Sequence, residues 1–102
     1  MTLSPEQKDA IKHKVADCLR HEPEVRRIVV FGSFVMSSAP HDLDVAVFQD
    51  SEEGYLPLAL KYRRLLRGIA AMIPIDVVPL HIHGPAGEFL KEVEQGEVVY
   101  AR

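Results

Sequence analysis

The strongest constraint on the fold is an apolar segment, Ile28–Phe31, that ends at Gly32 and Ser33 and precedes two closely spaced acids, Asp42 and Asp44. Side chains two positions apart on a β-strand point to the same side of the sheet. Both carboxylates would therefore project together from a strand whose other residues are apolar. Because an isolated carboxylate is costly to remove from water, such acids need a cation or hydrogen-bond donors beside them.

A third acid, Asp76, lies between Ile75 and Val77 in a later apolar segment. Two or three carboxylates that converge on one point offer hard oxygen ligands, which suit Mg²⁺ bound together with substrate phosphates. The turn at Gly32 and Ser33 is a candidate for contacting those phosphates. The sequence therefore predicts metal-dependent nucleotide chemistry.

The overall composition narrows the class of protein. A length of 102 residues predicts one domain over residues 1–102. A net charge of −3 and a pI of 5.9 argue against a dedicated nucleic-acid-binding module, although a local basic patch is compatible with them. The single cysteine, Cys18, excludes an internal disulfide and a multi-cysteine zinc site. No apolar run approaches the roughly 20 residues that span a membrane. The first residues lack the features of a signal peptide, so we expect a cytoplasmic protein.

Helix and strand patterns alternate along the chain. Ser4, Pro5 and Gln7 form a capping-box start for the first helix, and Pro23 requires that helix to end before it. Successive apolar residues in Ile28–Phe31 are typical of a strand that is covered on both faces. The predicted elements are a helix from Ser4 to about His21, strands Val25–Phe31, Asp42–Phe48 and Ile75–Leu80, a helical turn at Phe34–Met36, a helix from Leu56 to about Met72, and a helix from Pro85 to about Gln95. Val98–Tyr100 is either a short terminal strand or a packing tail.

Apolar spacing also predicts which side of each later helix faces the core. Gly96 fits the left-handed position that follows a helix end. The inward residues are predicted to be Leu58, Leu65, Ile69 and Met72 with Tyr62 and Leu66 beside them in the long helix, and Phe89, Leu90 and Val93 in the last helix.

The order of these motifs resembles the minimal nucleotidyltransferases of the DNA polymerase β superfamily. The shared features are an apolar strand, Gly-Ser, a short helix, Asp-x-Asp on the next strand and a third Asp on a later strand. The resemblance covers the chain from Val25 to its end. It implies an α/β (α+β) fold similar to the polymerase β palm, in which helices pack on a small mixed sheet of three or four strands. It also implies that the acids gather at one edge of that sheet.

The resemblance assigns a role to each residue of the motif. Gly32 would let the backbone approach a phosphate, and Ser33 would offer its hydroxyl and nearby N–H groups to the triphosphate. Asp42 and Asp44 would hold Mg²⁺, and Asp76 would complete the metal site and help activate the attacking hydroxyl. The implied reaction transfers a nucleoside monophosphate from a nucleoside triphosphate and releases pyrophosphate.

The resemblance also implies a biological setting. Minimal nucleotidyltransferases often pair with an α-helical HEPN-domain toxin and act as its antitoxin, some of them by transferring AMP from ATP to a toxin tyrosine. This chain would then be a protein adenylyltransferase. An alternative is a binding module of the same fold that inhibits its partner by contact. Met36 and Ser37 favour this alternative, because they stand where many members carry Arg-Gly. A third possibility, a small-molecule acceptor, is weaker because such enzymes generally carry an added domain.

Two further groups of residues invite a functional interpretation. His81 and His83 are two positions apart, so on a strand both imidazoles would face the same side and could bind a metal. A turn with exposed histidines is the simpler interpretation. His41 adjoins Asp42 and could contact the metal or the phosphates, although a structural or solvent-facing role is the simpler interpretation. A basic group on the long helix is a solvated helix face or a contact for an acidic partner or an RNA strand; its members are Lys61, Arg63, Arg64 and Arg67.

Overall fold

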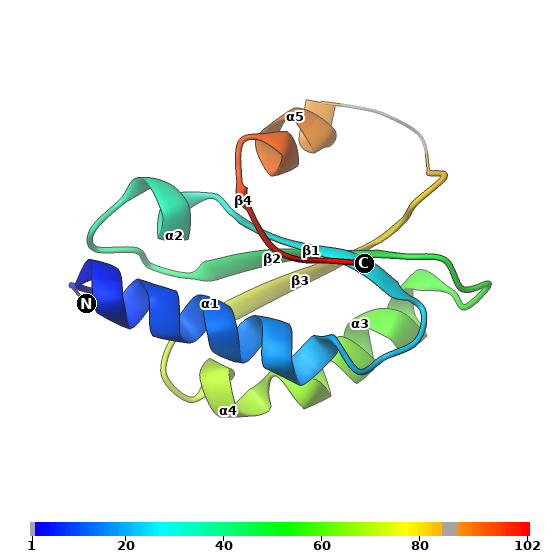
Figure 1. Cartoon of the computed structure of the whole chain (residues 1–102), viewed down its shortest axis with the longest axis horizontal. Coiled ribbons are helices and arrows are strands. Elements are labelled where there is room, and N and C mark those ends of the chain that lie inside the picture. The colour runs from blue at the N-terminus through cyan, green and yellow to red at the C-terminus, as the bar shows by residue number, and fades with distance from the viewer. Residues whose placement is uncertain (1, 85–87) are drawn as a thin grey trace.

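The computed structural model describes residues 2–84 and 88–102, in which four strands form one sheet (Figure 1). The spatial order of the strands is β3-β2-β1-β4. The elements in chain order are α1 (Pro5–Leu19), β1 (Val25–Phe31), α2 (Ser33–Met36), β2 (Leu43–Gln49), α3 (Tyr55–Leu65), α4 (Arg67–Ala70), β3 (Ile75–His81), α5 (Glu88–Glu94) and β4 (Glu97–Ala101). The predicted α/β fold with a small mixed sheet is confirmed.

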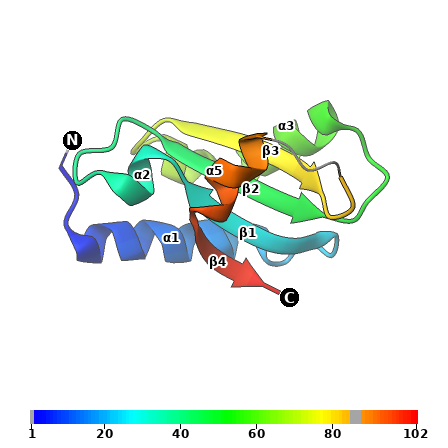
Figure 2. The same cartoon turned by 90° about the horizontal axis from the view of Figure 1, so that it is seen from above.

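The connections explain why the sheet is mixed. β1 pairs antiparallel with β2 and with β4, whereas β2 and β3 run parallel (Figure 2). Parallel neighbours need a crossover connection, and α3 and α4 supply it. Val98–Tyr100, for which the sequence allowed either a strand or a packing tail, lies in strand β4. This strand forms one edge of the sheet.

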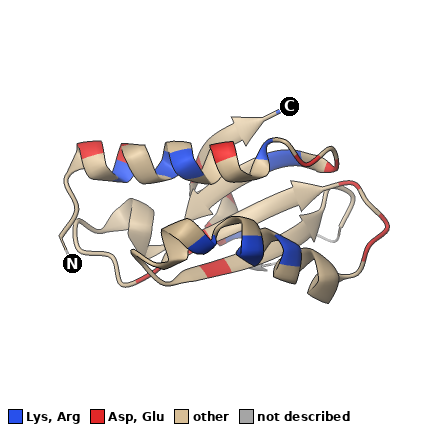
Figure 3. Ribbon diagram, turned by 90° about the horizontal axis from the view of Figure 1, so that it is seen from below, with Lys and Arg blue, Asp and Glu red and all other residues tan. Residues whose placement is uncertain are grey.

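Helices lie on both faces of the sheet. α1, α3 and α4 form a layer on one face, and α5 lies over the other (Figure 1). Seen from the side of this helical layer, basic residues lie along α3 and α4, and residues of both charges lie along α1 (Figure 3). In the described part of the chain, no helix has the length and apolar character that crossing a bilayer requires.

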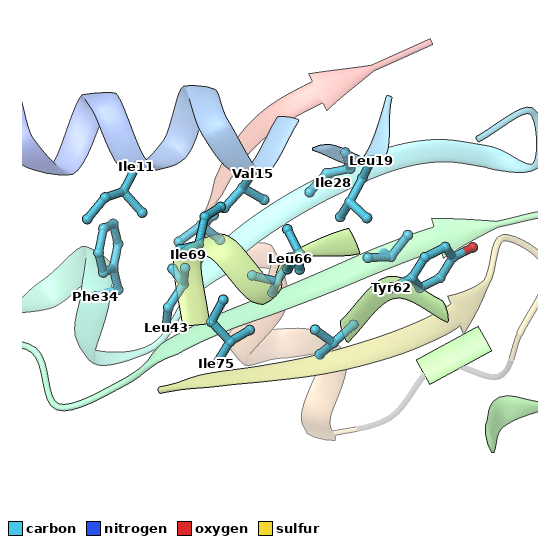
Figure 4. Packing of buried hydrophobic residues seen from close by; sticks show 14 of the residues in the cluster. Ile11, Val15, Leu19, Ile28, Phe34, Leu43, Tyr62, Leu66, Ile69 and Ile75 are labelled. Carbon is cyan, nitrogen blue, oxygen red and sulfur yellow. The ribbon is translucent and has the colours of Figure 1, made fainter. Parts of the chain in front are cut away.

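Strand alternation divides the core between the two faces. Leu43, Val45 and Val47 of β2 pack with residues of α1, α3 and α4 (Figure 4). Ala46 and Phe48 of the same strand belong to a second apolar group, which lies on the α5 face. Because Asp44 has the same strand parity as that second group, its side chain also faces the α5 side.

The long helix predicted to run from Leu56 to about Met72 is divided in two. α3 ends at Leu65, and Leu66 has φ −95° and ψ 6°, outside the helical region, before α4 begins. Leu66 is buried, whereas Leu65 is 38% exposed and Met72 is 45% exposed. The prediction that those two residues face inward is therefore wrong. Apolar residues surround this helix on most sides, so spacing alone was unable to select the buried side.

Gly96 does not adopt the predicted left-handed conformation. Gly32 is the one glycine with positive φ among the described residues. Gly96 instead adjoins β1, where an added Cβ would lie 2.4 Å from the Val30 carbonyl oxygen. The close approach of the α5–β4 turn to β1, and not backbone conformation, therefore requires glycine at this position.

The remaining boundaries differ by a few residues. α1 ends at Leu19, β2 begins at Leu43 and β3 extends to His81. The predicted start of the last helix at Pro85 and the predicted inward side chain of Phe89 lie outside the described residues. Leu90 and Val93 pack on the α5 face as expected.

Candidate metal centre

The three predicted acids come together at the end of the sheet where β2 and β3 begin. The parallel register places Asp44 of β2 beside Asp76 of β3, and Asp42 lies just before β2. One carboxylate oxygen from each acid lies within 4.8 Å of the other two. Because β2 is an interior strand, the acids meet at an end of the sheet and not along one outer strand.

Gly32 packs directly against one of these carboxylates. Its φ of 76° and ψ of −150° belong to a region that residues with a Cβ rarely occupy. An added Cβ would lie 2.4 Å from Oδ2 of Asp44. Glycine is therefore required here both by the backbone conformation and by the space that the Asp44 carboxylate takes.

Ser33 lies beside another acid of the group. It is the first residue of α2, and its hydroxyl donates a hydrogen bond to Oδ1 of Asp42 at 3.3 Å. The Gly-Ser turn predicted to accompany the acids thus contacts two of them, through Gly32 on Asp44 and Ser33 on Asp42.

The electrostatics of Asp44 are unfavourable without a counter-ion. Desolvation by burial is the main cause that raises the pKa of the Asp44 carboxyl to about 6, and the charges of Asp42, Asp76 and Glu92 raise it further. Glu92 belongs to α5, which lies over this face of the sheet. Sequence reasoning missed this fourth acid, because no local pattern reveals which helical side chain lies near a strand.

The donor set fits a hard divalent cation. Carboxylate oxygens are the ligands that Mg²⁺ and Ca²⁺ prefer, and Mg²⁺ commonly uses few carboxylates together with substrate phosphates. A bound cation would offset the repulsion that acts on Asp44. Within residues 2–84 and 88–102, these acids are the one group of three or more histidine, cysteine or acidic residues arranged to hold a metal.

None of the histidine candidates belongs to the group of possible metal ligands found among the described residues. His41 is exposed, and the backbone N–H of His83 donates a hydrogen bond to Nδ1 of His81 at 3.1 Å. His81 is the last residue of β3, at the opposite end of the strand from Asp76. The pair therefore belongs to the turn that follows β3.

The basic group predicted on the long helix divides into residues with different surroundings. Nζ of Lys61 lies 2.7 Å from a carboxylate oxygen of Glu24, which also accepts a hydrogen bond from the hydroxyl of buried Tyr62. Arg63 donates to the carbonyl of Ile75 at 3.5 Å. Lys61 and Arg63 thus have structural partners.

Taken together, the fold and the acids define a class: a small α/β protein that presents three grouped carboxylates beside a Gly-Ser turn. A sequence model of the family described as polymerase beta, nucleotidyltransferase matches residues 13–102. The chain belongs to this nucleotidyltransferase family.

Solved structures support the same fold. A chain in the structure of the tri-AMPylated Shewanella oneidensis HEPN toxin in complex with MNT antitoxin is 18% identical, with a TM-score of 0.68; the match covers 93% of this chain and 73% of that one. A chain of the MntA–HepT toxin–antitoxin complex is 18% identical, with a TM-score of 0.65 and coverage of 92% and 73%. A toxin–antitoxin structure with AMP-PNP matches at 20% identity and a TM-score of 0.63, with coverage of 89% and 73%. A comparison with curated proteins yields no match.

Proposed function

We propose that this protein is a Mg²⁺-dependent nucleotidyltransferase that transfers AMP from ATP to a hydroxyl of a HEPN-type toxin and thereby acts as its antitoxin. The observation that carries the proposal is the meeting of Asp42, Asp44 and Asp76 around one point, with Gly32 packed against Asp44. A cytoplasmic location, inferred from composition, is part of this proposal.

Each residue of the site has a role in the proposed reaction. Asp42 and Asp44 hold the cation, and Asp76 completes its ligand set and helps to activate the acceptor hydroxyl. Gly32 and Ser33 receive the triphosphate, since the turn lies directly beside the acids. When bound, Mg²⁺ neutralises charge on the attacking and leaving oxygens.

The choice of donor and acceptor draws on the relatives. One is described as the complex of an AMPylated HEPN toxin with its MNT antitoxin, and another as a toxin–antitoxin structure with AMP-PNP. The exposed carboxylate of Asp76 supports an acceptor that arrives from outside the protein.

A second candidate is inhibition by contact alone, and the surroundings of α2 favour it. Met36 is 81% exposed and Ser37 follows it, so neither position offers the arginine that could bind phosphate through two hydrogen bonds. An exposed methionine at the end of α2 would instead suit contact with an apolar surface of a partner.

The test is transfer of radiolabel from α-labelled ATP to the HEPN-type partner by wild-type protein and by Asp44→Asn. We expect the variant to lose labelling while it still binds the partner, because the amide removes a metal ligand but leaves the fold unchanged. Asp50→Asn is the matched control, since Asp50 pairs with Arg26 away from the acids. Equal labelling by wild type and Asp44→Asn would remove the enzymatic proposal, and binding without labelling by either would establish the contact mechanism.

A further inference from the structure

The helical layer carries a groove that the proposed reaction does not use. The groove measures about 680 Å³ and lies between α1 and the α3–α4 pair. The helices that line the groove lie on the opposite side of the sheet from α5 (Figure 1). Because Asp44 faces the α5 side, the groove and the acids are on opposite faces. A molecule bound in the groove would leave the acids accessible.

Part of the lining of the groove is apolar. Leu65 and Met72 contribute side chains that are 38% and 45% exposed, and half-buried Cys18 lines the groove from α1. Gly68 leaves the groove open between them, since an added Cβ there would meet no atom within 4 Å. Exposed apolar side chains around an open groove are typical of a surface that another protein covers.

The rim of the groove is basic. Lys14, Arg64 and Arg67 line it, and none of these three forms an ion pair with any residue that the structure describes. The one acid of the lining, Asp17, lies 3.8 Å from Arg20. This local excess of positive charge belongs to a chain whose net charge is −3.

The basic residues of α3 that do not line the groove, Lys61 and Arg63, have hydrogen-bond partners within the described chain. Nζ of Lys61 lies 3.3 Å from a carboxylate oxygen of Glu22 and 2.7 Å from one of Glu24. Arg63, which also does not line the groove, donates to the carbonyl of Ile75 at 3.5 Å. Neither Arg64 nor Arg67 has an acidic partner in the described part of the chain.

We propose that this groove receives an acidic amphipathic helix of the partner protein. A groove between two helices matches the ridges of a third helix, whose apolar stripe would cover Leu65 and Met72. Acidic residues that flank the stripe would face Lys14, Arg64 and Arg67, and such charge complementarity selects the partner and its orientation. The identity of the partner rests on the proposed function. The chemistry of the bound helix follows from the groove itself.

The single cysteine makes the groove directly observable, because Cys18 is part of its lining. The experiment measures the rate at which iodoacetamide alkylates Cys18 while a synthetic amphipathic helix with leucines on one face and glutamates on its flanks is added. We expect saturable protection of the thiol. The same peptide with lysines in place of the glutamates should not protect, since the rim would repel it.

Charge reversal tests whether the rim provides the specificity. Arg67→Glu should raise the half-protecting peptide concentration about tenfold, which corresponds to roughly 1.4 kcal/mol of binding free energy. Lys91→Glu, a reversal at an exposed position on α5, is the matched control and should leave protection unchanged. Circular dichroism of both variants establishes that they fold.

Several outcomes would overturn the proposal. They are absence of protection, equal protection by the lysine peptide, and unchanged protection in Arg67→Glu. Protection that grows with the concentration of the chain alone would assign the groove to a second copy, and protection by single-stranded polyuridine would assign it to nucleic acid. Asp44→Asn separates the two proposals: the groove inference requires normal protection in this variant, whereas the transferase proposal requires that it lose AMP transfer.

Discussion

At the scale of single residues, the arrangement of the acids depends on a close contact at Gly32 that leaves no room for a Cβ. Gly32 combines a glycine-specific backbone conformation with a carboxylate 2.4 Å from where its Cβ would lie. Burial and the charges of three other acids raise the pKa of Asp44, so its ionised form is unfavourable in the folded protein. Substitution of either residue should therefore change the stability of the protein measurably.

Replacing Gly32 with alanine should lower stability and weaken metal binding together. The strained backbone alone is expected to reduce the free energy of unfolding by roughly 1–3 kcal/mol. The new methyl group would also displace the Asp44 carboxylate. Urea unfolding and a magnesium titration measure the two effects. Gly68→Ala is the control, because an added Cβ at that helical position meets open space. Its free energy of unfolding should rise by roughly 0.5–1 kcal/mol. An equal change in stability and metal binding in the two variants would contradict the special role of Gly32.

Replacing Asp44 with asparagine should stabilise the metal-free protein near neutral pH. The folded pKa of about 6 exceeds the ordinary value of 3.8. The ionised carboxylate therefore opposes folding above pH 6, and this penalty vanishes as the pH falls toward 3.8. The difference in Tm between variant and wild type should be positive at neutral pH and shrink on acidification. Asp50→Asn should instead destabilise at neutral pH, since it removes the ion pair with Arg26; a pH-independent difference for Asp44→Asn would refute the assignment.

At the scale of elements, the crossover between β2 and β3 brings two distant acids into register. α3 and α4 must pack on the sheet for β3 to align beside β2. The hydroxyl of Tyr62 on α3 donates a hydrogen bond of 2.8 Å to Glu24, which precedes β1. Burial raises the pKa of Glu24, but the hydrogen bonds from Lys61 and Tyr62 outweigh this effect and hold the pKa below its ordinary value.

Tyr62→Phe should therefore reduce stability by about 1–2 kcal/mol, because Glu24 keeps its partly buried carboxylate and loses one donor. The loss should be largest where Glu24 is ionised and should diminish on acidification, since a carboxylate with a lowered pKa stabilises the fold above its unfolded pKa. Denaturant unfolding at several pH values measures this. Tyr100→Phe, at an exposed hydrogen bond with Arg102, should change stability little; equal losses would show that the buried network has no special weight.

At the scale of the whole molecule, the sheet separates the acids from the groove. One face carries the acids, and the helical layer on the other carries the groove. Binding of a cation to the folded state alone should stabilise the entire chain by mass action.

Magnesium should therefore raise the Tm of the wild-type protein, with about 2.7 kcal/mol of stabilisation at a hundredfold excess over the dissociation constant. Asp76→Asn should respond much less, because it loses one of the grouped carboxylates. Asp17→Asn, at the groove, should respond as the wild type does. A thermal-shift titration with and without EDTA decides this, and an undiminished response in Asp76→Asn would place the cation elsewhere.

Local patterns in the sequence were sufficient for the first three strands, the first helix and the motif, whereas β4 remained open between a strand and a packing tail. Apolar runs define β1 and β2, Ser4 and Gln7 form the predicted capping box of α1, and two acids one residue apart on β2 necessarily share a side. These features depend on residues only a few positions apart, so the sequence alone predicts them.

Tertiary structure alone decided the rest. Which strand lies beside Asp44, that Glu92 adds a fourth charge, that Gly96 adjoins the Val30 carbonyl, and that the long helix breaks at Leu66 all depend on contacts between distant segments. Such contacts arise when the sheet and helices bury their apolar faces against one another, and no spacing along the chain encodes the resulting distances.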